Sequence, residues 1–175
     1  VVLVRVLFWP PAPLASTGPE TLLGVRVGDP QQAVADNLGL SRGGPVKDPW
    51  APGPPPVYLG RVLTPELLGL SNDDLQNLDV RRDKDESVCV VFVGGKVRGL
   101  AVRKPHVGTT GRGVGVSGPQ SAVAARYGED FRQDVLPGRD SGPETLVRIY
   151  KAAGVGFEIQ DGTVTAAALY PAVAP

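Results

Sequence analysis

The chain contains one stretch of sequence twice. Residues 24–39, GVRVGDPQQAVADNLG, align without a gap on residues 113–128, GVGVSGPQSAVAARYG. The identical positions are mainly Gly, Val, Pro and Ala, which fix turns and packing and do not supply reactive groups. A repeat of this kind predicts two copies of one structural unit.

Each copy predicts a short helix that follows an extended Gly-Val-x-Val approach. We expect Pro30 and Pro119 at the first helical position, where a missing N–H group costs nothing. Asp29 is expected to cap the first helix. Gly39 and Gly128 are predicted to end the two helices in the left-handed conformation that glycine tolerates.

A β-hairpin is predicted after each helix, because apolar alternation flanks a two-residue turn signal. The hairpins cover residues 88–104, about Gly94-Gly95, and residues 155–169, about Asp161-Gly162. A preceding strand is expected at 146–152 in the second copy, with 57–63 as its counterpart in the first. Residues 129–145 are predicted to form a loop.

The first copy has an insertion that the second copy lacks. The helices are offset by 89 residues (Gln31 and Gln120) and the hairpin turns by only 67 (Gly95 and Gly162), so 22 extra residues lie within residues 40–86. Two helix starts are predicted in this insertion, one at Thr64-Pro65 and one at Ser71.

The patterns together predict an α+β fold of two tandem helix-plus-antiparallel-sheet repeats forming one pseudo-symmetric body. The two sheets are expected either to join edge to edge or to pack as a pair under the helices. The first unit is residues 1–104, with the insertion at 40–86, and the second is residues 105–175. Residues 1–16 fit either the end of a secretory signal or a first β-strand.

The charge balance argues against a general nucleic-acid binder. Eighteen basic and eighteen acidic side chains cancel, so the chain lacks the basic excess that holds proteins on nucleic acid or anionic lipid. Its apolar runs are too short to predict a transmembrane segment, and peripheral association with an envelope stays open. The single cysteine, Cys89, lies in an apolar run and is expected to be a buried, inert thiol.

Glycines, acidic residues and apolar residues at fixed spacing carry a family resemblance. They are Gly24, Gly28, Asp29, Val34, Leu38 and Gly39, and then Gly113, Val123, Tyr127, Gly128, Tyr150, Gly154, Phe157, Asp161, Gly162 and Val164. The unit resembles the helix-plus-antiparallel-sheet unit of the small outer-membrane-assembly lipoproteins, and the tandem arrangement resembles the secreted β-lactamase-inhibitor proteins. The chain lacks the paired cysteines of the inhibitors. The resemblance implies an extracytoplasmic bacterial protein that binds other proteins and has no catalytic site.

The candidate chemical motifs are weak. Residues 113–118 match G-x-G-x-x-G, but no buried strand precedes them, and Arg26 breaks the pattern in the first copy. His106 stands beside Pro105 in the connector, without a nucleophile nearby in sequence. The acidic groups, 73–74 and 83–86, follow no EF-hand spacing. The sequence therefore predicts no catalytic residue, no cofactor and no metal site.

Two aromatic residues of the insertion are the candidate partner-binding residues. Trp50 stands in a proline-rich stretch and Tyr58 follows three consecutive prolines. Aromatic side chains on a stiff loop are effective interface anchors. Trp50 also fits a lid folded over its own sheet. We expect a non-enzymatic protein-binding or scaffold protein of the bacterial cell envelope or secreted space. The alternative is a small-ligand-binding protein or an enzyme whose dispersed polar residues meet only in space.

Overall fold

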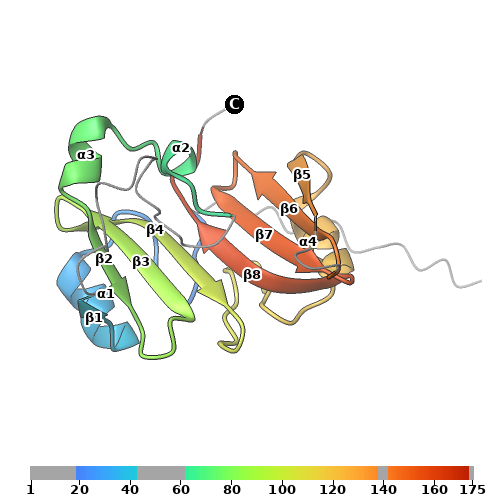
Figure 1. Ribbon diagram of the computed structural model, residues 1–175, viewed down its shortest axis with the longest axis horizontal. Coiled ribbons are helices and arrows are strands. Elements are labelled where there is room, and N and C mark those ends of the chain that lie inside the picture. Colours follow the sequence, from blue (N-terminus) through green and yellow to red (C-terminus); the bar gives the residue numbers. More distant parts are fainter. Residues whose placement is uncertain (1–18, 43–61, 138–141, 174–175) are drawn as a thin grey trace, which may run out of the picture.

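The strands form a single antiparallel sheet in the computed structural model, which describes residues 19–42, 62–137 and 142–173 (Figure 1). Within these residues the sheet has eight strands, in the order β1-β2-β3-β4-β8-β7-β6-β5. The predicted combination of helices with an antiparallel sheet is confirmed. The elements are β1 (Ser41–Arg42), β2 (Asp79–Arg82), β3 (Val88–Val93), β4 (Lys96–Arg103), β5 (Arg132–Leu136), β6 (Thr145–Tyr150), β7 (Val155–Gln160), β8 (Thr163–Leu169), α1 (Gln31–Leu38), α2 (Pro65–Leu68), α3 (Asn72–Gln76) and α4 (Gln120–Tyr127).

The two predicted hairpins are present as β3-β4 and β7-β8. Both central residues of each turn have positive φ: 57° and 73° at Gly94 and Gly95, and 48° and 70° at Asp161 and Gly162. Two-residue turns of this conformation match the right-handed twist of the flanking strands. Local turn chemistry therefore sets where each hairpin reverses.

The two halves of the sheet share one pairing register. In the first half Val88 lies opposite Val102, and in the second half Val155 lies opposite Leu169, with each residue number 67 higher. The facing residues of β2 and β3 likewise correspond to facing residues of β6 and β7 at the same offset. The irregularity after Val91 recurs after Glu158, again 67 residues later. Each residue of β2, β3 or β4 up to Val102 therefore has a counterpart 67 residues later in β6, β7 or β8.

The halves join edge to edge through β4 and β8. Ala101 lies opposite Ala168, and these two residues are themselves counterparts at the offset of 67. Leu100 lies opposite Leu169, while Val102 lies opposite Ala167. The pairing register about Ala101 and Ala168 is therefore the same when it is followed from either half, although the side chains differ. Of the two arrangements expected for the sheets, the edge-to-edge one is present.

The helices α1 and α4 begin one residue later than predicted. The first residue of each helix makes an equivalent hydrogen bond to a hairpin turn. Pro30 and Pro119 are the N-cap residues, in extended conformation, and not the first helical residues. The amide of Gln31 donates to the carbonyl of Gly95 at 2.9 Å, and the amide of Gln120 donates to that of Gly162 at 2.8 Å. These bonds satisfy an N–H group that a helix end would otherwise leave unpaired.

The predicted cap by Asp29 is wrong. Its Oδ2 atom accepts from the amide of Arg26 at 2.8 Å, within the turn that precedes the helix. At the other end, Gly39 adopts the predicted left-handed conformation, with φ 61° and ψ 35°. Gly128 also has positive φ, but its ψ of −162° takes the chain out of the helix in a different direction. The two helix ends therefore differ.

The insertion contains α2 and α3, which begin where the sequence predicts. Thr64 caps α2 through a bond from the amide of Leu67, and Ser71 forms a reciprocal capping box with Asp74. Most of the strand predicted at 57–63 lies outside the described residues, and its predicted role as the counterpart of β6 is wrong, because β2 (Asp79–Arg82) has that register. The loop predicted over 129–145 contains β5, which pairs with β6.

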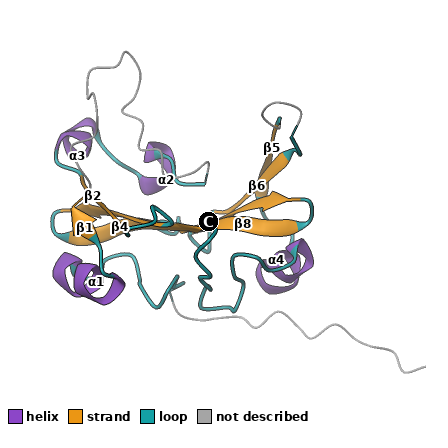
Figure 2. Ribbon diagram, turned by 60° about the horizontal axis from the view of Figure 1, so that its bottom comes forward, coloured by secondary structure: helices purple, strands orange, loops and turns teal. Residues whose placement is uncertain are grey.

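Helices cover the two faces of the sheet unequally. Figure 2 shows α1 and α4 on one face, under the two halves, and α2 and α3 on the other face, over the first half. We call these the α1/α4 face and the α2/α3 face. Over β6, β7 and β8, the described part of the chain places no helix on the α2/α3 face. This asymmetry distinguishes the second half from the first.

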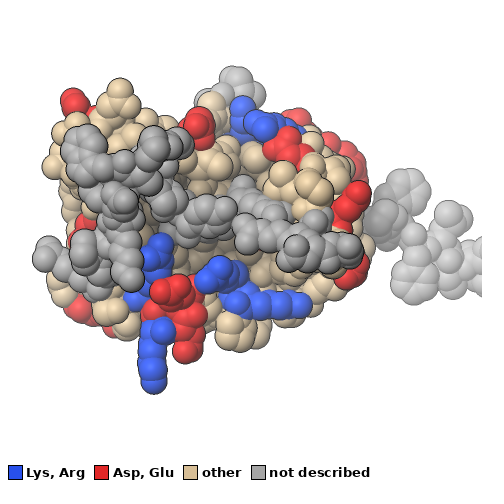
Figure 3. Space-filling model, viewed as in Figure 1, with Lys and Arg blue, Asp and Glu red and all other residues tan. Residues whose placement is uncertain are grey.

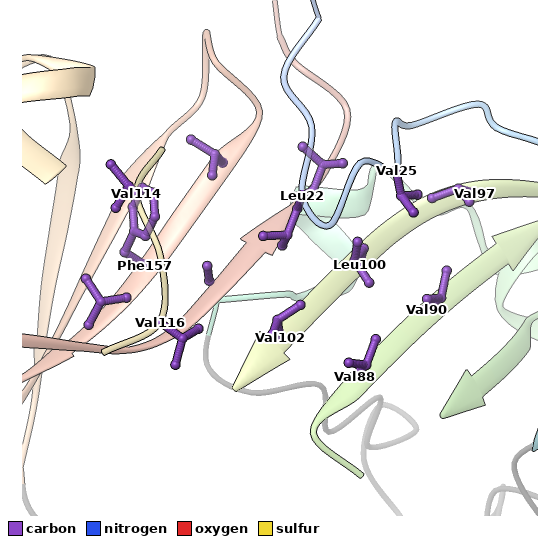
Figure 4. Close-up of a cluster of buried hydrophobic side chains, with 14 of the residues drawn as sticks. Leu22, Val25, Val88, Val90, Val97, Leu100, Val102, Val114, Val116 and Phe157 are labelled. Atoms are coloured by element: carbon purple, nitrogen blue, oxygen red, sulfur yellow. The ribbon is translucent and has the colours of Figure 1, made fainter. Parts of the chain in front are cut away.

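The larger core lies between the sheet and the α1/α4 layer, and Figure 4 shows its central part. Val34 of α1 and Val123 of α4 pack in it, with Phe92 and Phe157 from the sheet. The smaller core, on the α2/α3 face, includes Leu68 of α2. The two cores run through both halves of the sheet and account for the burial of both of its faces.

An extended segment before α1 links the two halves. Leu22 is fully buried and forms isolated bridges with Val25 and Thr110. The amide of Leu23 donates to the carbonyl of Thr109 at 3.2 Å, and the amide of Gly111 donates to that of Thr21 at 2.9 Å. The segment that leads into α1 therefore binds the segment that leads into α4.

Candidate binding surface

Counterpart positions on the α2/α3 face differ in polarity between the two halves. Val91 packs in the smaller core beneath α2, and its counterpart in β7 is Glu158. Val93 and Leu78 likewise correspond to Gln160 and Thr145. The contrast is confined to these three positions, because other residues of the second half on the same face are buried in the smaller core, namely Val147, Ile149, Ala168 and Tyr170. Apolar surface requires a cover and polar surface does not, so this contrast follows the asymmetry of the fold.

We call the polar positions on this face of the second half the β6–β8 polar patch, defined by Thr145, Glu158, Gln160 and Thr165. The side-chain amide of Gln160 donates to Oγ1 of Thr145, which is buried, at 2.7 Å. The Thr165 hydroxyl reaches the backbone carbonyl of Glu158 at 3.4 Å. Glu158, Gln160 and Thr165 are partly exposed. The patch therefore carries carboxylate, amide and hydroxyl groups on three neighbouring strands.

The charged side chains on this face are mixed in sign (Figure 3). Basic and acidic groups lie next to each other along the edge that is lowest in Figure 3, below β3 and β4. Arg103, at the end of β4, lies opposite Ala166 beside the patch, and its Nε donates to the carbonyl of Glu86 at 3.1 Å. Neither sign of charge dominates this face among the residues that Figure 3 colours.

The predicted partner-binding residues Trp50 and Tyr58 lie outside the described residues. The polar patch was not identified from the sequence, although the signal was available. Applying the offset of 67 to the sheet positions pairs Val91 with Glu158 and Val93 with Gln160. A change from apolar to polar at equivalent strand positions marks a change in what covers them.

A second polar group lies where β2 turns into β3. Ser87 Oγ donates to Oδ2 of Asp83 at 2.6 Å, and the amide of Val88 donates to Oδ1 at 2.8 Å. Burial opposes ionisation of Asp83, but these hydrogen bonds outweigh it and lower the pKa, with a smaller contribution from His106. Because Ser87 donates directly to the carboxylate, the arrangement is that of a turn-stabilising contact and not of an activated nucleophile.

The predicted inert thiol matches the surroundings of Cys89. The residue is 6% exposed and faces the smaller core. Burial raises the pKa of the Cys89 thiol to about 11, although the Arg82 guanidinium beside it acts in the opposite direction. The protonated thiol, which is a poor nucleophile, is therefore the form present at neutral pH.

The glycines of residues 113–118 make close contacts with the chain itself. A Cβ atom on Gly115 would lie 2.9 Å from Cγ2 of Thr109 and 3.0 Å from the carbonyl oxygen of Gly108. Val114 and Val116, between these glycines, are buried in the larger core. The motif therefore packs a loop against the sheet, as the sequence comparison of the two copies predicts.

Comparisons of the chain with protein-family models, curated proteins and solved structures gave no significant match. Among the described residues, no group of three or more His, Cys, Asp or Glu side chains could hold a metal ion. No helix within those residues combines the length and apolar character needed to cross a membrane.

Proposed function

We propose that the chain is a non-enzymatic protein-binding or scaffold protein of the bacterial cell envelope or secreted space. It engages a protein partner through the β6–β8 polar patch. The observation that carries this proposal is the replacement of apolar Val91 and Val93 by partly exposed Glu158 and Gln160 at the equivalent strand positions.

We further propose that the two halves are copies of one ancestral unit and form a pseudo-symmetric body. The residue pairs of β2-β3 and β3-β4 support this, because each has a corresponding pair 67 residues later in β6-β7 or β7-β8. Equivalent backbone hydrogen bonds before the two helices also support it. The amide of Gly28 donates to the carbonyl of Val97, and the amide of Ser117 donates to the carbonyl of Val164, both at 2.8 Å. The insertion with α2 and α3 then belongs to the first copy alone.

The extracytoplasmic location and the contribution of Trp50 and Tyr58 to the partner surface are parts of the same proposal. The sequence resemblance supports the location, and the proline-rich context supports the aromatic anchors. Fractionation of native cells with an antibody against the chain tests the location, since recovery with cytosolic markers contradicts it. Alanine replacement of both aromatic residues should weaken partner recovery without lowering the yield of folded protein.

Site-specific photo-crosslinking in native cells tests the binding surface. A photoreactive amino acid at Gln160, within the patch, should give a discrete protein adduct. The matched control is Gln32, the same residue type, exposed on α1 and remote from the patch. An adduct at Gln160 but not at Gln32, identified as an envelope or secreted protein, supports the proposal. Equal labelling at both positions, or no protein adduct at Gln160, contradicts it.

A further inference from the structure

The outer strand β5 has one paired side and one unpaired side within the described sheet. Its five residues pair with β6 from Arg132 opposite Ile149 to Leu136 opposite Thr145, and β5 is last in the strand order. Val135 is 52% exposed, and the side chains of Arg132 and Asp134 are 61% and 38% exposed. An exposed edge of this length has backbone donors and acceptors ready to pair with another strand.

The side chains of β5 make this edge complementary to itself. Arg132 and Asp134 lie on the same face of the strand, two residues apart, with Gln133 between them on the opposite face. Within one chain the side chains of Arg132 and Asp134 form an ion pair at 2.8 Å. Two copies of β5 in antiparallel pairing about Gln133 place Arg132 of each copy opposite Asp134 of the other, so that the two ion pairs join into one network of four alternating charges. Opposite charges on directly facing residues favour pairing, and like charges oppose it.

We propose that two copies of the chain associate through their β5 strands, antiparallel and centred on Gln133, to form one continuous sheet. The charge pattern selects this register from its neighbours. Pairing centred on Arg132 or on Asp134 would place that residue opposite its own copy, with like charges in contact. Charge complementarity therefore fixes the partner as a second copy and also fixes its alignment.

The symmetry of the contact explains why the association ends at two copies. A contact that uses the same strand in both copies closes on itself, whereas a β1–β5 contact would continue into a filament. The antiparallel meeting of β4 and β8 about Ala101 and Ala168 is the same kind of contact, already present within one chain.

The mass of the chain in solution gives the first test. Sedimentation equilibrium from low concentration up to about 1 mM should show a concentration-dependent shift from 18.3 kDa toward twice that mass. A chain that stays monomeric throughout this range overturns the proposal. Association beyond the dimer also contradicts it, because the β5 edge is used only once in each copy.

Charge exchange on β5 gives the decisive test. Arg132→Asp and Asp134→Arg should each weaken association at least tenfold, because each puts like charges opposite one another. The double variant, Arg132→Asp with Asp134→Arg, restores opposite pairs and should recover wild-type association to within about threefold. Both side chains are partly exposed, and circular dichroism checks that every variant is folded. Failure of the double variant to recover, or indifference of the dimer to the single changes, contradicts the proposed strand contact.

Cysteine pairing tests the register. In a Cys89→Ala background, Gln133→Cys places the new thiol opposite itself, within the Cα separation of about 4.4–6.8 Å that a disulfide needs. Val135→Cys is the matched control, since the two copies of this residue would lie about 14 Å apart. Oxidation should link the Gln133→Cys dimer and leave Val135→Cys unlinked. The reverse result, or equal linkage of both, overturns the register.

Discussion

The hydroxyl of Tyr127, at the end of α4, donates a hydrogen bond to Oε2 of Glu20 at 2.9 Å, although the two residues are 107 positions apart. The Glu20 side chain is 3% exposed, and Arg112 Nε lies 3.2 Å from the same oxygen. The guanidinium of Arg112 also stacks over the Tyr127 ring, 4.8 Å from its centroid. Burial raises the pKa of Tyr127, so the hydroxyl remains a donor throughout the neutral range.

Neutralising Glu20 should therefore destabilise the fold. Glu20→Gln keeps the shape of the side chain but leaves the Arg112 guanidinium without its nearby anion, at a cost of about 2 kcal/mol. Urea denaturation measures the change in the free energy of unfolding. The control is Asp36→Asn on α1, where the exposed carboxylate pairs with the side-chain amide of Gln32 at 2.8 Å, and this change should cost less than about 0.5 kcal/mol. Equal effects of the two changes would show that the buried pair contributes no more than the exposed one.

Gly99 should be intolerant of a methyl group, although its counterpart in the second half is Ala166. A Cβ atom at Gly99 would lie 2.3 Å from Cδ2 of Leu68 and 3.2 Å from the carbonyl oxygen of Leu169. Gly99→Ala should lower the free energy of unfolding by about 1–3 kcal/mol, because α2 must move away. Ala166→Gly, the matched exchange, should cost about 1 kcal/mol or less. A neutral Gly99→Ala change would mean that α2 does not pack tightly on β4.

Asp83 should make stability depend on pH in the acid range. Because hydrogen bonds from Ser87 and Val88 lower its pKa in the folded chain, its contribution is complete above the unfolded pKa of about 4 and is lost as the pH falls below that value. Asp83→Asn should cost about 1 kcal/mol at neutral pH and less at about pH 2. Denaturation of both proteins at the two pH values measures this difference. Asp85→Asn, which removes an exposed carboxylate from the same turn, is the control for the loss of one negative charge.

Cys89 should make stability depend on pH in the alkaline range. Its pKa of about 11 lies above the unfolded value of about 8.5, so its stabilising contribution is present below the lower value and is lost as the pH rises toward the higher one. Between about pH 8 and about pH 10, wild type should therefore lose more stability than Cys89→Ala. Both proteins keep the buried tyrosines, whose contribution cancels in this comparison. Parallel losses in the two proteins would contradict a stability contribution from the protonated thiol.

The sequence predicted the hairpins and the inserted helices because their signals are local. Gly94-Gly95 and Asp161-Gly162 determine the reversal of the chain, and Thr64 and Ser71 supply caps from within one turn. The helix starts at Pro30 and Pro119 were placed one residue too early, because their first amides pair with the distant hairpin turns. Such a contact has no sequence signal near the proline.

The strands β2 and β5, near the two edges of the sheet, were harder to predict because most of their residues are polar. β2 begins Asp-Val-Arg-Arg, and its place in the sheet comes from pairing with β3 and from the contact of Gln31 with Asp79. β5 reads Arg-Gln-Asp-Val-Leu, in which polar residues obscure the alternation. The candidate surface was missed for another reason: Glu158 and Gln160 are informative only when compared with Val91 and Val93 in the register of the sheet.

The bridge between Leu22 and Thr110 bears on how the chain comes apart. The segment before α1 binds the segment before α4, while β4 and β8 share the centre of the sheet, so each half buries surface that belongs to the other. Separating the halves would expose both cores at once. The chain should therefore lose its structure in a single cooperative transition, with spectroscopic probes placed in the two halves reporting the same midpoint.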